Sequence, residues 1–358
     1  VGSVDIETVQ AEPLPGDEIA ADIVLGIESA PPRTIAAQLA YDTEDGIRLE
    51  GSWQHRNLIR PEGAVTAAAI LGNEQQALGL SLRRSNYKKR DRTIGGGIFF
   101  TLEDRDAFYR RAVELNAFLE RETNLIWQKR WTYQLGPELI FSQERDRSAT
   151  VGRRAPIEDY VIGAFQGRLG YDGSDDLLNP TTGFRISGLA SPEVSLQGGT
   201  FAYARTEIEA SAYLPFGADD EFVLAGRGLV GSIIGAGREN IAPSRRLYAG
   251  GGGSVRGFGF QDLGPRDPDG DPLGGRSVVE GSLEARYRFG DLGAVAFADV
   301  GQVYSGSDPG FQDLRVGLGV GARYFTSFGP VRVDIATPLD RRPGESRVAL
   351  YVSIGQAF

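Results

Sequence analysis

Apolar and polar residues alternate along most of this chain, in runs that are long for a β-protein. Within residues 313–325, every second position from Leu314 to Tyr324 is apolar, and the positions between them hold only arginine and glycine. Successive side chains of a β-strand point to opposite faces of its sheet, so a period of two predicts strands. These runs are roughly 9 to 13 residues long, whereas strands of globular proteins usually have ~5 to 6 residues.

The polar face of these predicted strands is charged, which distinguishes between two kinds of β-protein. Residues 278–289 carry Glu280 and Glu284 on one face and mainly apolar residues on the other. A soluble sandwich buries its apolar face against a second sheet and normally uses shorter strands. Long strands with a charged face favour a membrane barrel, with lipid outside and water inside.

About sixteen such strands fit between Arg33 and Phe358, at roughly 20 residues for a strand with its connection. This spacing agrees with the ~9 to 11 residues that a membrane strand needs. The mean hydropathy is only −0.23, because each strand is half polar. The sequence therefore predicts an all-β fold, a transmembrane antiparallel β-barrel of about 16 strands over residues 31–358.

The first thirty residues do not share the barrel pattern. Residues 4–11 are predicted to form a short strand, residues 14–18 a turn and residues 19–28 a second extended run. We interpret residues 1–30 as the end of a periplasmic domain, together with the linker that leads into the barrel.

The net charge and the missing residue types exclude several classes of function. A formal net charge of −10 argues against nucleic acid as a partner. The absence of cysteine excludes disulfides and thiolate metal sites, and a single histidine, His55, excludes a histidine-rich metal site. We therefore expect no metal and no cofactor.

A barrel hydrolase is the enzymatic alternative, and it needs a nucleophile, a base and a group that orients the base. His55 is the only imidazole, and it alternates with the apolar residues of its strand, which places it nearer the membrane interface than the lumen. The sequence has no G-x-S-x-G nucleophile elbow. We predict no catalytic residues. A passive porin is a further alternative, and its mark would be a high conductance that is independent of any loop.

A glycine-rich stretch, AGGGGSVRGFGF, leads to the single arginine Arg256 within a long connection at residues 245–275. Long loops without secondary structure are usually functional or disordered. Arg256 either extends into solvent or folds back into the lumen, where Glu280, Glu284 and Asp299 of the following strands offer carboxylates. A guanidinium suits such a site because its planar fork binds two carboxylates and keeps its charge. The glycines allow the backbone to approach the wall closely.

Several short motifs, spread over essentially the whole chain, resemble those of one family of membrane barrels. That family is the outer-membrane assembly superfamily, which includes BamA, TamA and the two-partner secretion translocases. The matching pieces are VRGF (Val255, Arg256, Gly257, Phe258), FADVG around Asp299, SWQHRNL at 52–58, NPTTGF at 179–184 and FGPVRVD at 328–334. The resemblance implies that Arg256 pairs inside the lumen with acids of the next strands, which here are Glu284 and Asp299.

The last run, residues 348–358, alternates and ends on an aromatic residue. Leu350, Val352 and Ile354 share one face, with Phe358 in phase. Outer-membrane barrels resemble this pattern, and their terminal strand acts as an insertion signal. Residues 34–41 would form the first strand and meet the last one at a seam, which Gly355 weakens near its end. Our hypothesis is that this seam opens sideways and that its exposed edge templates an incoming strand.

The ending SIGQAF and the compact loops look most like the TamA branch of the superfamily. This resemblance implies three POTRA domains before the barrel, the third of them ending within residues 1–30, and a TamB-like periplasmic partner. It also implies a place in the outer membrane of a Gram-negative bacterium and, as clients, outer-membrane proteins that include autotransporters. A general BamA-type insertase and a two-partner secretion translocase are the alternatives within the family.

Overall fold

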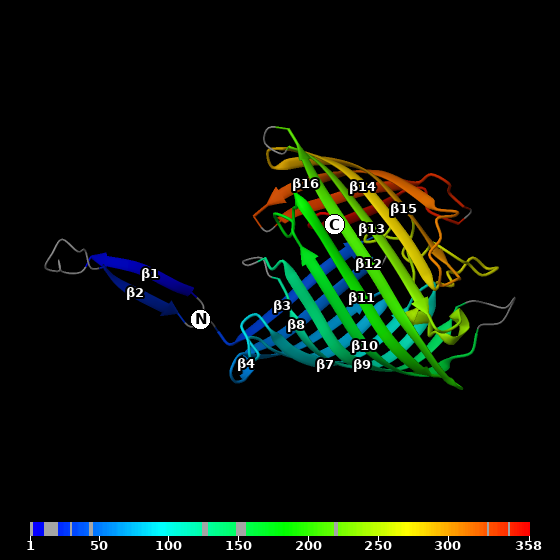
Figure 1. The fold of residues 1–358 in the computed structure, drawn as a ribbon, viewed down its shortest axis with the longest axis horizontal. Coiled ribbons are helices and arrows are strands. Elements are labelled where there is room, and N and C mark those ends of the chain that lie inside the picture. The colour runs from blue at the N-terminus through cyan, green and yellow to red at the C-terminus, as the bar shows by residue number, and fades with distance from the viewer. Residues whose placement is uncertain are drawn as a thin grey trace.

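A single antiparallel sheet of sixteen strands, β3 to β18, makes up most of the molecule. The computed structural model describes residues 3–10, 21–28, 31–42, 46–123, 128–147, 155–217, 221–327, 329–342 and 344–358. Each strand pairs with its neighbours in sequence, and the sheet curves round into a barrel of strongly tilted strands (Figure 1). The predicted all-β architecture and the number of strands are confirmed.

The strands are long, as the alternating runs predict. They are β3 (Arg33–Asp42), β4 (Gly46–Ile59), β5 (Gly63–Gly72), β6 (Gln75–Arg84), β7 (Thr93–Asp104), β8 (Phe108–Arg121), β9 (Trp131–Asp146), β10 (Glu158–Asp172), β11 (Gly183–Leu196), β12 (Thr200–Phe216), β13 (Phe222–Ile234), β14 (Ser277–Phe289), β15 (Leu292–Tyr304), β16 (Arg315–Thr326), β17 (Gly329–Pro338) and β18 (Ala349–Ile354).

The two faces of the sheet differ in the way that a membrane barrel requires. On β16, the outward residues Val320 and Tyr324 are 61% and 55% exposed, whereas the inward Arg315 and Arg323 are buried. Exposed apolar side chains recur on the outside of strand after strand, which forms a belt far larger than the apolar patches of soluble proteins. A polar, charged interior inside such a belt is the arrangement of barrels that lie in lipid.

Strand β8 shows the height of this belt on its outer face. Between Arg111 and Arg121, the outward residues are Val113, Leu115, Ala117 and Leu119. Ten residues span roughly 33 Å along a strand, and a tilt of ~40° reduces this to about the ~25 Å of an outer-membrane apolar band. The two arginines therefore mark the two edges of the band.

Outside the barrel, β1 (Ser3–Gln10) and β2 (Ala21–Glu28) pair with each other in a separate two-stranded sheet. This hairpin lies beyond the beginning of β3 (Figure 1). The turn predicted at residues 14–18 lies outside the described residues. Among the residues that the structure describes, no helix is long and apolar enough to cross a membrane.

The ends of the sheet, β3 and β18, meet without a regular ladder. In the described part of the chain, no hydrogen-bonded pairing joins them, although their Cα atoms come within 8 Å. We call this junction between β3 and β18 the seam. The prediction that the last strand fills residues 348–358 is wrong in length, because β18 stops at Ile354 after six residues.

A charge in the middle of the outer belt is expected to destabilise the barrel, and a charge at its edge is not. Leu115→Lys should cost about 2–4 kcal/mol of unfolding free energy in phospholipid vesicles, because the ammonium lies at the bilayer midplane. Leu102→Lys is the matched control, since Leu102 pairs with Arg111 at the edge of the belt and should cost about 0–1 kcal/mol. Equal costs in denaturant titrations would contradict the assignment of the belt.

Candidate functional site

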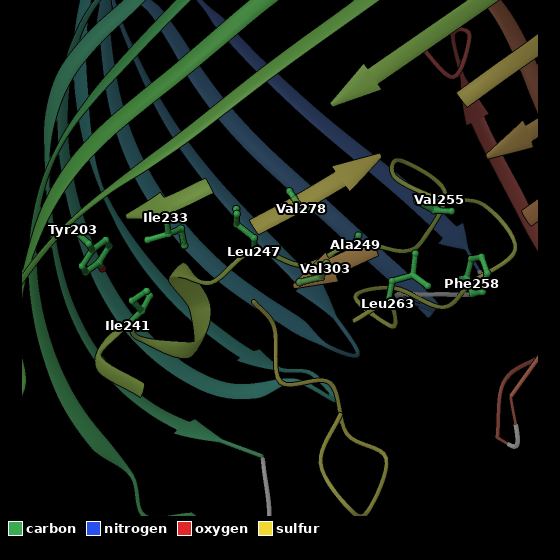
Figure 2. Close-up of a cluster of buried hydrophobic side chains, with 10 residues drawn as sticks. All are labelled: Tyr203, Ile233, Ile241, Leu247, Ala249, Val255, Phe258, Leu263, Val278 and Val303. Atoms are coloured by element: carbon green, nitrogen blue, oxygen red, sulfur yellow. The ribbon is translucent and has the colours of Figure 1, made fainter. Parts of the chain in front are cut away.

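The connection between β13 and β14, residues 235–276, folds into the barrel, and we call it the lumenal loop. It begins with two short 3-10 turns, η1 (Arg238–Asn240) and η2 (Pro243–Arg245). An apolar cluster joins it to the walls (Figure 2), so the loop does not extend into solvent. The cluster consists of Tyr203, Ile233, Ile241, Leu247, Ala249, Val255, Phe258, Leu263, Val278 and Val303.

At the tip of the lumenal loop, Arg256 contacts three buried carboxylates. Its Nε and Nη2 donate to the two oxygens of Asp299, at 2.7 and 3.0 Å. Its Nη1 lies 2.7 Å from Glu284 Oε1 and 3.0 Å from Asp334 Oδ2. Arg256 is 2% exposed. The structure thus brings together Arg256, Glu284 and Asp299, the three residues that the family resemblance pairs, and it adds Asp334.

The surroundings hold Arg256 in one orientation. Its guanidinium carbon lies 3.4 Å from the centre of the Phe297 ring, and the backbone N–H of Arg256 donates to Asp299 (3.0 Å). Next along the loop, the backbone N–H of Gly257 donates to the Tyr351 hydroxyl (3.0 Å), which itself donates to the carbonyl of Phe258 (3.2 Å). Because Tyr351 belongs to β18, the loop tip is tied directly to a strand of the seam.

Glycines on the inner face of β16 make room for this site. A Cβ on Gly317 would lie 1.9 Å from the Arg256 carbonyl oxygen, and one on Gly321 would lie 2.0 Å from Asp334. Gly257 has a φ of +101°, which L-residues rarely adopt. Of the three glycines in the Gly-x-Gly-x-Gly pattern of β16, Gly317 therefore leaves room for the loop backbone, while Gly319 and Gly321 leave room for Phe297 and Asp334 of the neighbouring strands.

Electrostatics keep Arg256 charged despite its burial. Burial alone would lower the pKa of the guanidinium, but the hydrogen bonds to Asp299 and the charges of Glu284 and Asp334 raise it above its ordinary value. Two further arginines share the carboxylates: Arg286 donates to Glu284 (2.8 Å) and Arg323 to Asp334 (2.5 Å). The result is a network of opposite charges in which each carboxylate has a cationic partner.

The base of the lumenal loop has a second anchor, which the sequence analysis missed. Ser244 donates to Glu144 through its backbone N–H (3.0 Å) and its hydroxyl (2.7 Å). Arg245 forms a two-point contact with Glu193, and Arg246 donates to Asp146 (2.6 Å). The sequence shows a pair of arginines after Pro243, which could have indicated this anchor. Their partners are acids about 50 or 100 residues earlier, and no pattern near the arginines in the sequence identifies those acids.

Asp334 and Tyr351 were missed for a different reason. Asp334 lies in the FGPVRVD segment, and Tyr351 alternates with the outward residues of the last run, so their inward orientation was readable from the sequence. Which inward side chains lie at the height of Arg256 depends on strand register. Asp334 is opposite Gly321 on β16 and Tyr351 on β18, and no sequence signal fixes that alignment.

The predicted seam residues divide into two groups. Leu350, Val352 and Ile354 are exposed on the outer face of β18, as their alternation indicates. Gly355 follows the strand with a φ of +92°, and the chain turns there. The prediction that Phe358 continues the outward face of the seam strand is wrong, because this turn directs the residues after Gly355 into the barrel.

Inside the barrel, Phe358 stacks on Tyr213 with ring centres 6.5 Å apart, and the Arg286 guanidinium lies 5.1 Å from its ring. Gln356 bonds to Leu178 and Asn179 of the connection between β10 and β11. The segment after β18 therefore leads from the seam to the inner face of β12.

Comparison with known proteins identifies the family. Residues 62–358 match the model of the Omp85 superfamily domain. The chain belongs to the Omp85 superfamily. It is therefore a barrel of the outer membrane of a Gram-negative bacterium, as predicted.

The relatives of this Omp85 chain carry names from two groups. It is 24% identical over 363 residues to the outer membrane protein assembly factor BamA of Nitratidesulfovibrio vulgaris. The match covers 99% of this chain but only 45% of that relative. The chain thus spans less than half of the BamA protein. BamA of Haemophilus ducreyi lacking POTRA domains 1–3 shares the fold, with a TM-score of 0.76 and 17% identity over 97% of this chain and 74% of that one. CdiB of Acinetobacter baumannii has a TM-score of 0.58 and 11% identity, over 99% of this chain and 66% of that one.

Removing Arg256 is expected to destabilise the barrel more than removing any exposed arginine. Arg256→Ala leaves Asp299 and Asp334 buried beside one another without their central cation, which should cost about 3–5 kcal/mol. Urea unfolding in vesicles measures the loss, with the exposed Arg288→Ala as control.

Gly317→Val keeps every charge but forces the loop off β16, so it should also lower the free energy of unfolding. A stable Gly317→Val protein would contradict the close packing of the loop.

A separate contact near the loop predicts a pH dependence. Glu345, between β17 and β18, accepts from both terminal nitrogens of Arg315 (2.5 and 3.0 Å) and from the backbone N–H of Arg342 (2.8 Å). Burial would raise the pKa of Glu345, but these hydrogen bonds hold it below its ordinary value of 4.5. Arg315 in turn lies 4.7 Å from the ring of Phe258.

Because the folded pKa is lowered, the stabilisation from Glu345 is present above pH 4.5 and is lost as the pH falls below it. Glu345→Gln should cost about 1.5–3 kcal/mol of unfolding free energy at pH 7. The difference between the two proteins should shrink as the pH is lowered from 4.5. A difference that stays constant over that range would show that the carboxylate does not carry the interaction.

Proposed function

We propose that this chain is the membrane part of a protein that inserts or translocates other outer-membrane proteins through its seam. The observation that supports this most directly is the seam itself. Fifteen neighbouring pairs of barrel strands are joined by ladders, and in the described residues β3 and β18 are not. A barrel in lipid normally pairs every strand. An unpaired junction is therefore a feature that calls for a function.

The proposed mechanism needs hydrogen bonding and no catalytic residue. An unpaired strand edge presents a row of backbone N–H and C=O groups that can pair with another strand. β3 offers ten residues and β18 only six, so β3 is the longer template. A client strand would add to this edge by β-augmentation. Each later strand of the client would then pair with the client strand before it.

The lumenal loop would hold the wall beside the seam during this process. Tyr351 of β18 is bonded to the loop tip, and Arg256 links that tip to β14, β15 and β17. Opening at β18 would therefore be coupled to the Arg256 site. Breaking the site should change how often the seam opens, even in a protein that remains folded.

The finer assignment is to the TamA type. The SIGQAF ending and the compact loops support it, and it brings a TamB-like periplasmic partner and autotransporters among the clients. Residues 1–30 would then be the end of the third POTRA domain. Leu350, Val352, Ile354 and Phe358 would act in this chain's own insertion, as the terminal residues of outer-membrane barrels do.

Closing the seam covalently tests the mechanism. The chain has no cysteine, so an engineered pair is unambiguous: one at Ile35 on β3 and one at Leu350, Val352 or Ile354 on β18, chosen as the pair that forms a disulfide on oxidation. Oxidation should abolish assembly of a client barrel in vesicles, and reduction should restore it. Cysteines at Val113 and Phe141, which are direct partners on β8 and β9, are the control and should not affect assembly. Full activity of an oxidised seam would rule out lateral opening.

Depleting the full-length protein in its own cell separates the branches. Loss of a subset of outer-membrane proteins, with autotransporters among them, supports the TamA type. Loss of nearly all barrels would indicate a BamA-type general insertase, and loss of one secreted protein a two-partner translocase. An unchanged membrane, together with high conductance that does not depend on the lumenal loop, would favour a passive porin.

A further inference from the structure

A groove crosses the outer face of the barrel from β5, two strands from β3, to β10. Its volume is about 730 Å³, within the usual range for small-molecule sites. One bank is a row of outward apolar side chains: Leu71, Leu78, Phe100, Val113, Phe141 and Val161. The last five are direct neighbours across successive strands. The row is therefore continuous and, because the strands tilt, runs obliquely to the membrane.

The opposite bank of the groove is polar and lies at one edge of the lipid belt. It includes Gln76, Arg111, Gln143 and Asp159. Gln143 donates to Asp159 (2.9 Å). This edge lies at the end of the barrel away from the beginning of β3 and the N-terminal hairpin. If that hairpin is periplasmic, as the proposed function holds, the groove lies in the outer leaflet.

Two guanidiniums lie near one ring at this edge of the belt: Arg111 lines the groove, and Arg145 lies just beyond the bank on β9, opposite Tyr109. Arg111 and Arg145 lie 5.3 and 5.4 Å from the centre of Tyr109, and Arg111 also donates to the Tyr109 hydroxyl. Among the described residues, neither forms an ion pair with a carboxylate, while the nearby Asp104 is paired with Arg147. Two cations without acidic partners at the lipid edge are unexpected in a chain of net charge −10.

The strands that carry these cations are fixed from the inside. Gln143 and Arg145 point outward from β9, and the residues next to them, Glu144 and Asp146, hold the base of the lumenal loop through Ser244 and Arg246. A site on a wall braced in this way is preorganised, which lowers the entropic cost of binding a ligand.

We propose that this groove binds a phosphorylated, acylated glycolipid of the outer leaflet. An acyl chain would lie along the apolar row, and a phosphate would bind to the guanidiniums of Arg111 and Arg145. Guanidinium groups bind phosphate through paired hydrogen bonds, and these are stronger at the dehydrated edge of a membrane than in water. Gln143 and Asp159 offer the amide and carboxylate groups that sugar hydroxyls bind.

Binding of bisphosphorylated lipid A to the purified full chain in neutral detergent micelles tests the proposal. Arg111→Gln with Arg145→Gln should weaken binding about tenfold to a hundredfold, the equivalent of one or two charge-assisted hydrogen bonds. Removing both phosphates from lipid A should weaken its binding to the unchanged protein by the same factor. The dephosphorylated lipid and the double variant thus test the same contact from its two sides. The matched control is Arg84→Gln, which changes an outward arginine at the other edge of the belt and should not alter binding.

Three outcomes would overturn the proposal. Equal affinity in the double variant and the unchanged protein would show that the two arginines are not the site. Equal binding of phosphatidylglycerol would indicate general attraction of anionic lipids, and displacement by millimolar inorganic phosphate would indicate an ordinary anion site. Because the readout is lipid binding, it is independent of client assembly, so failure here would leave the proposed function untouched.

Discussion

The charge network around Arg256 is the interaction on which the rest of this structure depends. A buried arginine is stable only with partners in good geometry, and here its partners come from β14, β15 and β17. Those strands must therefore keep one relative register, and β16 between them must present glycine to the loop. A single side chain thus constrains four neighbouring strands as well as the loop that carries it.

The lumenal loop has a second role as a brace across the barrel. Its base is held by Glu144, Asp146 and Glu193 on one wall, and its tip by Asp299 and its neighbours on another. The apolar cluster between the two anchors buries the loop against the walls. Ordering a loop of this length costs conformational entropy, and the two charged anchors with the apolar cluster offset that cost.

This bracing leaves the seam as the part of the barrel with the fewest constraints. β18 is short, it is tied to the loop through Tyr351, and it continues at Gly355 into a segment that ends against Tyr213 of β12. Among the described residues, β18 is thus positioned by its ladder with β17 on one edge and by the contacts of Tyr351 on its inner face, and no ladder holds its other edge. A strand held in this way can leave its neighbour on one edge without disturbing the ladder on the other. The proposed lateral opening uses that asymmetry.

The sequence by itself determined the barrel, because a period of two and a strand length are local properties that need no knowledge of the fold. Alternation placed Leu350, Val352 and Ile354 on the outer face, and the family resemblance paired Arg256 with Glu284 and Asp299. Only the tertiary structure decided which inward side chains lie at the height of Arg256, because strand register adds Asp334 and Tyr351 to the site. It also decided that Phe358 lies inside, since one positive φ at Gly355 reverses what alternation predicts. Contacts such as that of Ser244 with Glu144 join residues that are 100 apart in the sequence. The closure of the barrel brings these residues together, and no local sequence pattern encodes that closure.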